Sequence, residues 1–317
     1  MKLGLTHLRE PVSAADLAAT QAFYASRVGG VGPRTAAELA TVRAARAVDP
    51  ATPTRAVEEV VEVDGHRVPI RIITPEHGPA SGVHLYLHGG GFYMDSAART
   101  DAHNTRLADA IGAVVVGVDY RLAPESAWPA APDDCETVAR WLIDTGARRF
   151  GTTALTIGGM SAGSTLAMTT LLRLRDRGLA SVFTGAVLEA GSYDLSAQTP
   201  SGRTIADEYF IEAYVGHVDD RTVADISPVF ADLRDLPPAL LVIGEDDVVL
   251  PDNLAMLARL VAAGNDVDLR LYPSAPHGFT MHPTPIGRQA LRDIDFWLTQ
   301  RLTHLDGRRS TEKLSSS

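Results

Sequence analysis

The sequence predicts an α/β fold in which a mostly parallel central sheet carries helices on both faces. Strand-length apolar runs alternate with helix-length segments from residue 83 to residue 302. Repeated strand–helix–strand units of this kind build parallel sheets that are covered on both sides. An Asp64-Gly65 pair stands between two alternating runs, which predicts a β-hairpin. The sheet should therefore have antiparallel strands at one edge.

Glycines mark the ends of several expected helices. Gly112, Gly178 and Gly264 stand where a left-handed C-terminal residue is favoured. The expected parallel strands are 83–87, 113–118, 155–157, 185–188, 239–243 and 267–272. The expected helices between and after them lie near 100–111, 133–147, 162–177, 252–263 and 286–302.

The chain divides into a core and additions around it. Residues 1–50 are Ala-rich with helical spacing, which predicts an N-terminal helical cap segment. Residues 192–230 break the alternation and carry aromatic residues among acidic ones, which predicts a helical cap insertion. The catalytic core then comprises 51–191 and 231–304, and the polar segment 305–317 is expected to be a disordered tail.

Charge and composition exclude several classes of partner. The chain has 317 residues, of which 45% are hydrophobic, and a formal net charge of -10. An acidic surface argues against nucleic acid and against anionic membrane faces. No apolar run approaches the roughly 18–20 residues that span a bilayer. We therefore expect a small-molecule partner, no nucleic acid and no membrane, with a homodimer as the candidate assembly.

Two features bear on the compartment. The only cysteine is Cys135, so no intrachain disulfide can form, which fits a reducing compartment. The N-terminus begins with Met-Lys, but His7, Glu10 and Pro11 interrupt any apolar core of a signal peptide. A cytoplasmic location is the expectation.

A candidate nucleophile lies between an expected strand and an expected helix. Residues 159–163 read Gly-Met-Ser-Ala-Gly, which is the Gly-x-Ser-x-Gly pattern of a nucleophile elbow. Such a tight turn admits only small neighbours and exposes Ser161 at a helix N-terminus, where developing negative charge is favoured. The pattern also occurs by chance as a glycine-rich turn, so its strand–turn–helix context carries the prediction.

Three glycines follow the strand at 83–87. The run His88, Gly89, Gly90 and Gly91 leaves backbone N–H groups unobstructed. Acyl transfer needs such amides, because losing one oxyanion donor typically costs about 3–4 kcal/mol of barrier. Gly89 and Gly90 are candidate donors, with Ala162 as a third. A loop kept bare for packing and a phosphate-binding loop are the alternatives, although no Lys or Arg is nearby. We expect His88 to be a buried anchor rather than a base.

A serine nucleophile needs a base, and the base needs a carboxylate that orients it. His277 follows the expected strand 267–272 directly, and His282 is its nearest rival. His217 falls in the cap insertion and His304 falls near the C-terminus. We therefore expect His277 to be the base.

The candidate carboxylates follow the strand expected at 239–243. They are Glu245, Asp246, Asp247 and Asp252, although Asp252 is equally placed to cap the next helix. The nucleophile, the base and this acidic loop all lie at carboxyl ends of strands, where open α/β sheets build their sites. A solvated acidic loop is the alternative interpretation.

Five ordered motifs resemble a known family. They read HGGGF, DYRLAPESAWPA, GMSAGS, GEDDVVLPDN and YPSAPHGF. Together they look like the bacterial branch of the α/β-hydrolases related to hormone-sensitive lipase, over about residues 57–302. The resemblance implies an α/β-hydrolase fold with a helical cap and hydrolysis of short- to medium-chain esters without a metal or other cofactor. It implies Ser161 as nucleophile, Asp247 as acid and His277 as base, with an oxyanion hole of Gly89, Gly90 and Ala162.

The motifs depart from the family pattern at three places. Met160 stands where Asp or Thr is usual, Ser164 replaces a second glycine, and LEAGSYDLS differs from a commoner Pro-containing segment. The departures bear on substrate preference. The residues expected to form the substrate pocket are Phe92, Tyr93, Met160, Tyr209, Phe210 and Tyr214.

Two other functions remain as alternatives to a serine carboxylesterase. One is a small-molecule receptor on the same scaffold without turnover, which would typically have a damaged triad. The other is an amidase or peptidase, which comparison of matched ester and anilide substrates would detect.

Overall fold

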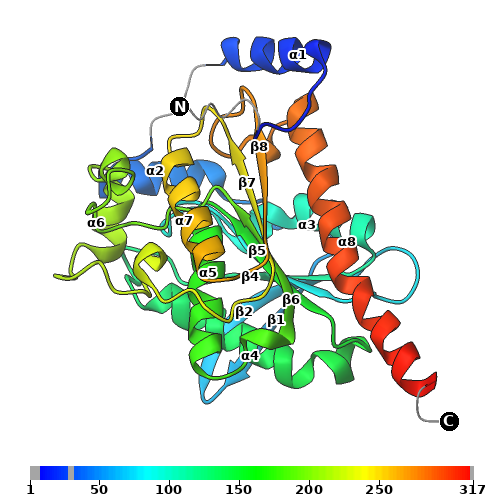
Figure 1. Ribbon diagram of the computed structural model, residues 1–317. Helices are drawn as coiled ribbons and strands as arrows, with labels where there is room; N and C mark the ends of the chain where they lie inside the picture. Colours follow the sequence, from blue (N-terminus) through cyan, green and yellow to red (C-terminus); the bar gives the residue numbers. More distant parts are fainter. Residues whose placement is uncertain (1–7, 28–31, 315–317) are drawn as a thin grey trace.

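A computed structural model describes residues 8–27 and 32–314, and an eight-stranded sheet forms its centre (Figure 1). The strands are β1 (Val57–Val63), β2 (His66–Ile73), β3 (Val83–Leu87), β4 (Val114–Val118), β5 (Leu155–Met160), β6 (Phe183–Glu189), β7 (Ala239–Gly244) and β8 (Val267–Tyr272). Their order in the sheet is β1-β2-β4-β3-β5-β6-β7-β8. All pairs from β4 to β8 are parallel, so the predicted mostly parallel sheet is confirmed.

The predicted hairpin forms one edge of the sheet. Strand β1 pairs antiparallel with β2 in a register that places Val63 opposite His66. Asp64 and Gly65 between them have φ of 53° and 78°. Positive φ at both central residues defines the turn that matches the twist of a hairpin, and Asp-Gly tolerates it. Strand β2 then pairs antiparallel with β4 and joins the hairpin to the parallel strands.

Helices cover both faces of the sheet. Their bounds are α1 (Ala14–Ala25), α2 (Ala36–Arg46), α3 (Asp101–Ile111), α4 (Ala130–Phe150), α5 (Ala162–Asp176), α6 (Tyr209–Val215), α7 (Leu250–Ala262) and α8 (Pro285–Leu314). Helices α4, α5 and α7 contribute to one buried cluster, and α3 and α8 contribute to the other (Figure 1). Helix α8 continues past the expected end at 302, so residues 305–314 of the expected disordered tail are helical. Residues 315–317 lie outside the described part.

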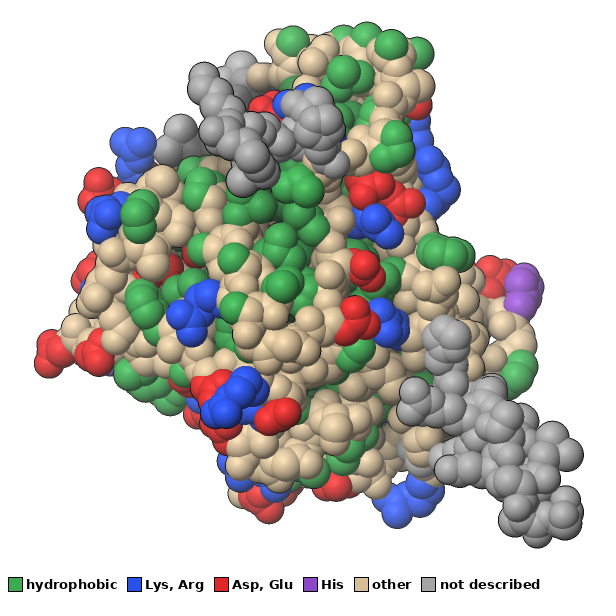
Figure 2. All heavy atoms as spheres, in the orientation of Figure 1, with side chains coloured by type: hydrophobic (Ala, Val, Ile, Leu, Met, Phe, Trp, Pro, Cys, Tyr) green, Lys and Arg blue, Asp and Glu red, His purple; other side chains and the backbone are tan. Residues whose placement is uncertain are grey.

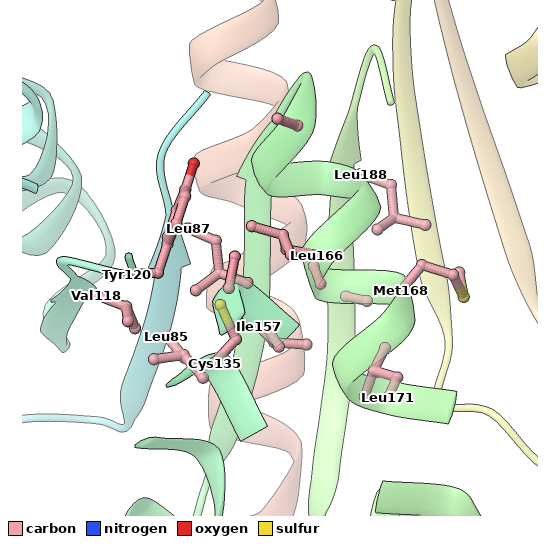
Figure 3. Packing of buried hydrophobic residues seen from close by; sticks show 14 of the residues in the cluster. Leu85, Leu87, Val118, Tyr120, Cys135, Ile157, Leu166, Met168, Leu171 and Leu188 are labelled. Carbon is pink, nitrogen blue, oxygen red and sulfur yellow. The ribbon is translucent and has the colours of Figure 1, made fainter. Parts of the chain in front are cut away.

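Alternation along the central strands divides the core into its two layers. In β3, Leu85 and Leu87 face the cluster that contains α4 and α5, whereas Tyr86 faces the cluster that contains α3 and α8. All five residues of β3 are buried. Figure 3 shows Leu85 and Leu87 packed among Cys135 and Leu166 from the covering helices. A strand buried on both faces needs the continuous apolar run that the sequence has here.

The N-terminal helices pack against loops that follow the strands. Helix α1 packs on α8, and the Tyr24 hydroxyl hydrogen-bonds His282 Nδ1 at 3.1 Å. Helix α2 is held by Arg43, whose Nε donates to the Tyr93 carbonyl at 2.8 Å. The expected 1–50 segment is thus helical where it is described, while residues 1–7 and 28–31 lie outside the described part. Its role as a cap stays a prediction.

The insertion 192–230 is less helical than expected. Only Tyr209–Val215 forms an α-helix within it, and short 3₁₀ turns occupy Gly202–Ile205 and Pro228–Phe230. Hydrogen bonds from side chains to the backbone stabilise the rest. For example, the Asp194 carboxylate accepts hydrogen bonds from the backbone amides of both Ser196 and Thr199. Such local bonding competes with helix formation.

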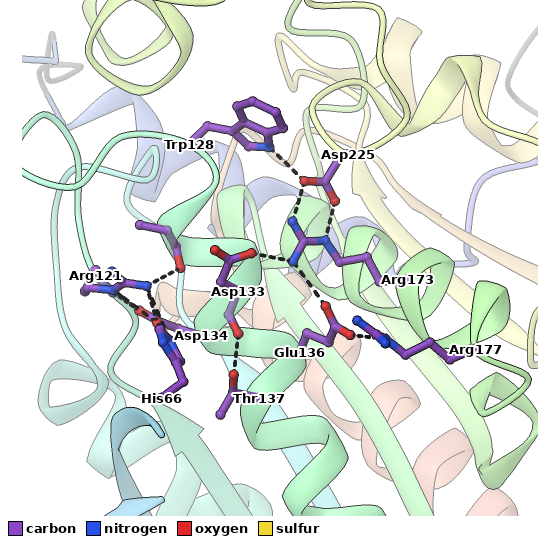
Figure 4. A network of polar contacts seen from close by, with 11 residues as sticks. His66, Arg121, Trp128, Asp133, Asp134, Glu136, Thr137, Arg173, Arg177 and Asp225 are labelled. Carbon is purple, nitrogen blue, oxygen red and sulfur yellow. Dashed lines mark hydrogen bonds and ion pairs between the residues drawn. The ribbon is translucent and has the colours of Figure 1, made fainter. Parts of the chain in front are cut away.

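A polar network attaches this insertion to the core (Figure 4). Arg173 of α5 donates two hydrogen bonds to Asp225 of the insertion and further bonds to Asp133 and Glu136 of α4. The indole N–H of Trp128 donates to the same Asp225 carboxylate at 2.8 Å. One guanidinium therefore joins the insertion, α4 and α5, the helix that follows Ser161.

Replacing this guanidinium should destabilise the protein more than replacing a neighbour that has one partner. Arg173→Gln removes the cation that pairs with Asp133 and Asp225 and one of the two that pair with Glu136. We therefore expect a loss of about 1–3 kcal/mol, between values typical of exposed and buried pairs. Arg177→Gln, which removes the single contact with Glu136 from a more exposed side chain, is the control. Urea denaturation at constant m value measures both. An equal loss for the two variants would contradict this role of Arg173.

Candidate active site

Ser161 occupies a strained turn between β5 and α5. Its φ of 55° and ψ of -121° lie in a region that non-glycine residues rarely adopt. A Cβ on Gly159 would lie 2.3 Å from the Leu87 carbonyl oxygen, and one on Gly163 would lie 2.0 Å from the same atom. Only glycine therefore fits on either side of the turn, which explains the Gly-x-Ser-x-Gly spacing.

Three side chains from three strand ends form a hydrogen-bonded row. His277 Nε2 lies 2.9 Å from Ser161 Oγ. His277 Nδ1 lies 3.0 Å from each carboxylate oxygen of Asp247. The Asp247 side chain is fully buried, whereas that of His277 is 38% exposed. The imidazole therefore has a carboxylate on its inner side and the serine hydroxyl on its outer side.

Close contact between two loops holds Asp247 beside His277. A Cβ on Gly244 would lie 1.9 Å from the Ala275 carbonyl oxygen, so glycine is needed where β7 ends. The Asp246 amide donates to that carbonyl, and the Val249 amide donates to Asp247 Oδ1 at 2.9 Å. Asp246 itself is exposed. The adjacent aspartates are thus distinguished: Asp247 contacts the imidazole and Asp246 faces solvent.

The glycine run lies directly against the turn that carries Ser161. A Cβ on Gly89 would lie 2.9 Å from the Met160 carbonyl oxygen and 3.5 Å from Ser161 Cβ. Gly90 has a φ of 115°, and its carbonyl accepts from the amides of Tyr93 and Met94. Ala162 is the first residue of α5, so its amide has no carbonyl four residues earlier in the helix. The amides expected to bind an oxyanion therefore come from elements adjacent to Ser161.

His88 is a buried anchor for this loop. Its ring stacks on Tyr120 with centroids 4.1 Å apart, and the Tyr120 hydroxyl donates to the His88 carbonyl at 2.7 Å. Burial lowers the pKa of His88. The His88 ring makes no hydrogen bond to the Ser161 hydroxyl, whereas His277 Nε2 does.

The rival histidine lies away from the serine. His282 faces α1 through its contact with Tyr24, and burial lowers its pKa. His217 lies on the insertion, with Nε2 3.1 Å from the Trp128 carbonyl oxygen. Nothing is described of the His304 side chain.

A cavity of about 150 Å³ opens at the serine. Its lining residues are Gly91, Phe92, Ser161, Ala162, Ser192, Ile205, Glu208, Phe210, Val248, Val249 and His277. Phe92 and Phe210 are the two expected pocket residues that line it. Tyr214 stacks behind Phe92 with centroids 4.1 Å apart, and Tyr93 is buried beside the cavity. Tyr209 lines a neighbouring groove of about 600 Å³.

Several lining residues were not predicted from the sequence. Val248 and Val249 follow Asp247 directly in the sequence, so their position next to a candidate carboxylate could have predicted that they line the cavity. Ser192, Ile205 and Glu208 come from the insertion. They have no motif of their own, and only the path of the insertion brings them to Ser161.

The departures from the family pattern have structural explanations. The Ser164 hydroxyl lies 2.8 Å from the Tyr193 hydroxyl, so these two residues, both unusual for the family, form a hydrogen bond with each other in the buried core. Gly191 permits this, because a Cβ there would lie 2.4 Å from the Tyr193 ring. The Met160 side chain packs near Gly89 and Gly278, between the glycine loop and the base loop, rather than in the cavity lining.

Two buried carboxyl groups stand near the site without contacting Ser161 through their side chains. Asp252 accepts from the amides of Tyr193 and Asp194, and burial raises its pKa to about 6. Asp252 lies in the first turn of α7, and its side chain fixes the start of the insertion through these two hydrogen bonds. Burial also raises the pKa of Glu189 to about 7, while its backbone carbonyl accepts from the Ser161 amide at 2.7 Å.

Fold and site together define a hydrolase with a serine at a strand–helix turn. The sequence family described as the alpha/beta hydrolase fold matches residues 84–281. The chain belongs to this family, and its resemblance to bacterial esterases related to hormone-sensitive lipase is confirmed.

Named relatives specify the class of enzyme. The chain is 28% identical to a putative acetyl-hydrolase, LipR, of Mycobacterium tuberculosis, over 95% of this chain and 97% of that protein. It is 32% identical to the carboxylesterase NlhH of the same species, over 71% of this chain and 75% of that protein. A fungal FAD-linked oxidoreductase of Aspergillus terreus is 30% identical over 75% of this chain, which spans only 31% of that longer protein.

Solved structures agree with this assignment. An esterase/lipase from an uncultured bacterium has a TM-score of 0.76 at 27% identity, over 92% of this chain and 99% of that one. The chain is therefore a carboxylesterase with the α/β-hydrolase fold. Among the residues that the structure describes, no helix is long and apolar enough to cross a membrane.

Proposed function

We propose that the protein hydrolyses short- to medium-chain acyl esters through a covalent acyl-Ser161 intermediate. One observation carries the proposal: the row in which His277 Nε2 lies 2.9 Å from Ser161 Oγ while Nδ1 contacts the buried Asp247 carboxylate. The distance of 2.9 Å from His277 Nε2 to Ser161 Oγ permits proton transfer, and the distance of 3.0 Å from His277 Nδ1 to each Asp247 oxygen permits the carboxylate to orient the imidazole. The esterase relatives support the same chemistry.

The proposed reaction has two halves. Ser161 Oγ attacks the ester carbonyl and gives its proton to His277, which then passes that proton to the departing alcohol. Water then attacks the carbonyl carbon of acyl-Ser161 while His277 takes a proton from that water. The bond from this carbon to Ser161 Oγ breaks, the acid leaves, and His277 returns the proton to Oγ. Asp247 holds the imidazole tautomer and stabilises the imidazolium that forms in each half.

Three amides are proposed to bind the oxyanion. Gly89 and Gly90 belong to the loop that lies against the Ser161 turn, and Ala162 opens helix α5. Amides at a helix N-terminus favour negative charge because the helix dipole adds to their own. Preorganised donors of this type often supply the largest single share of rate enhancement in acyl transfer.

Acyl chain length should separate this enzyme from long-chain lipases. The cavity of about 150 Å³ has walls of Phe92, Ile205 and Phe210, which leave little room beyond the reacting carbonyl. We expect kcat/KM to peak at about two to six acyl carbons, because each methylene adds about 0.8 kcal/mol of binding only while it finds space.

A series of p-nitrophenyl esters from acetyl to palmitoyl tests this directly. Rates should fall as the chain outgrows the cavity. A maximum at about twelve carbons or more, where added methylenes still gain binding, would reject the short-chain assignment. Absence of turnover across the whole series would reject ester hydrolysis itself and favour a receptor.

A further inference from the structure

One carboxyl side chain in the cavity lining, that of Glu208, has no part in the proposed chemistry. Glu208 lines the same cavity as Ser161 and His277, and it also lines the neighbouring groove of about 600 Å³. It stands directly before α6, yet its side chain makes no capping hydrogen bond there. Within the described residues it makes no ion pair, although Glu212, one turn later, pairs with Arg221.

Three aromatic side chains lie near Glu208. Tyr209 lines the groove beside it, and Phe210 lines the cavity. Near Gly32, the Tyr93 hydroxyl and a Glu208 carboxylate oxygen both approach: a Cβ there would lie 3.3 Å and 4.0 Å from them. Burial, followed by the Glu208 charge, raises the pKa of Tyr93 to about 12. Aromatic rings recognise quaternary ammonium groups through cation–π contacts, and a carboxylate beside them adds direct attraction between opposite charges.

Other charges near the groove leave it acidic. Its lining includes the carboxylates of Asp207, Glu208 and Glu212 and the guanidinium groups of Arg34 and Arg221, three acids against two bases. On the face shown in Figure 2, acidic and basic side chains are interspersed rather than segregated. A preference for cations at this site should therefore arise locally, from Glu208, rather than from a field of one sign over that face.

We propose that Glu208 is a specificity-determining residue that selects esters whose leaving alcohol carries a cationic ammonium group. This inference rests on the proposed ester hydrolysis. The small cavity retains the acyl group bonded to Ser161, while the larger neighbouring groove, which Glu208 also lines, accepts the alcohol. For a choline ester, the ester C–O bond breaks as the acyl group transfers to Ser161 Oγ. Choline leaves with the proton that His277 took from Ser161, and water then releases the acid.

A pair of isosteric esters isolates the charge. Butyrylcholine and 3,3-dimethylbutyl butyrate differ mainly in a quaternary nitrogen in place of a carbon. A unit charge about 4 Å from a solvated carboxylate should raise kcat/KM about fivefold for the choline ester. Glu208→Gln should remove this preference while p-nitrophenyl butyrate is still hydrolysed, which also reports on folding. Added salt should weaken the wild-type preference.

The control is Glu62→Gln, which removes the same charge from an exposed position on the edge strand β1. Its ratio for the two esters should match that of the wild type. An equal drop in both variants would replace the local explanation with one based on net charge, and an unchanged ratio in Glu208→Gln would overturn the inference.

A second pair tests the placement of the cation. The ethyl esters of 4-(trimethylammonio)butyrate and 5,5-dimethylhexanoate carry the charge difference on the acyl side. If Glu208→Gln alters the ratio for this pair alone, the alcohol assignment is wrong. If the wild type hydrolyses none of the esters, the proposed function fails, whereas hydrolysis with ratios insensitive to Glu208 counts against this inference alone.

Discussion

Ser161→Ala should abolish covalent labelling by a fluorophosphonate probe and lower kcat on p-nitrophenyl butyrate by about 10⁶, the loss known for a serine-protease nucleophile. The change removes the Oγ atom that lies 2.9 Å from His277 Nε2, which is the atom proposed to form the acyl bond. Residual turnover would come from the oxyanion donors and from substrate binding. Labelling by mass spectrometry and steady-state kinetics measure the two effects.

The fold should survive this change. The Ser161 amide keeps its bond to the Glu189 carbonyl, and alanine adds no atom to the turn. Ser192→Ala is the matched control, because Ser192 lines the same cavity without contacting His277. It should still be labelled. Labelling that persists in Ser161→Ala would assign the nucleophile to another serine.

Core strands and the nucleophile turn are predictable because local physics determines them. The run at 83–87 is buried on both faces, so it must be apolar throughout. Gly159 and Gly163 leave no space for a Cβ beside the Leu87 carbonyl, so the spacing of the motif records a steric requirement. Ser161 and His277 come together because each follows a strand whose carboxyl end lies at the same edge of the sheet.

The cavity lining is less predictable because it depends on contacts distant in sequence. The expected helical insertion is largely irregular, and side chains of the core fix its path: Asp252 at its start and Arg173 further on. Ile205 and Glu208 reach Ser161 through that path alone. Tyr214 was expected to line the pocket, yet it packs behind Phe92. A large aromatic ring buries much apolar area in a core as well as in a cavity wall, so its size does not distinguish the two positions.

Asp247→Asn should lower kcat by about 10⁴, by analogy with the same exchange in a serine protease. The Asp247 carboxylate accepts from His277 Nδ1 and so keeps the Nε2 lone pair available to Ser161. An asparagine amide can instead donate to Nδ1, which stabilises the tautomer with its proton on Nε2. That tautomer cannot take the proton of Ser161. The bond from the Val249 amide to Oδ1 can persist, so the loop should keep its shape.

Asp246→Asn is the control that the chain itself offers, one residue away. Asp246 is exposed, and its contact with the base loop runs through its backbone amide to the Ala275 carbonyl, which the substitution leaves intact. Its kcat should stay within about twofold of wild type, because the exposed Asp246 side chain makes no hydrogen bond to His277 and surface substitutions usually change stability by no more than about 0.5 kcal/mol. Measurement of kcat on p-nitrophenyl butyrate, with folding checked by circular dichroism, compares the two variants. A crippled Asp246→Asn beside a near-normal Asp247→Asn would transfer the acid role to Asp246, and equal losses in both would show that the charge of the loop, rather than the tautomer of His277, governs the rate.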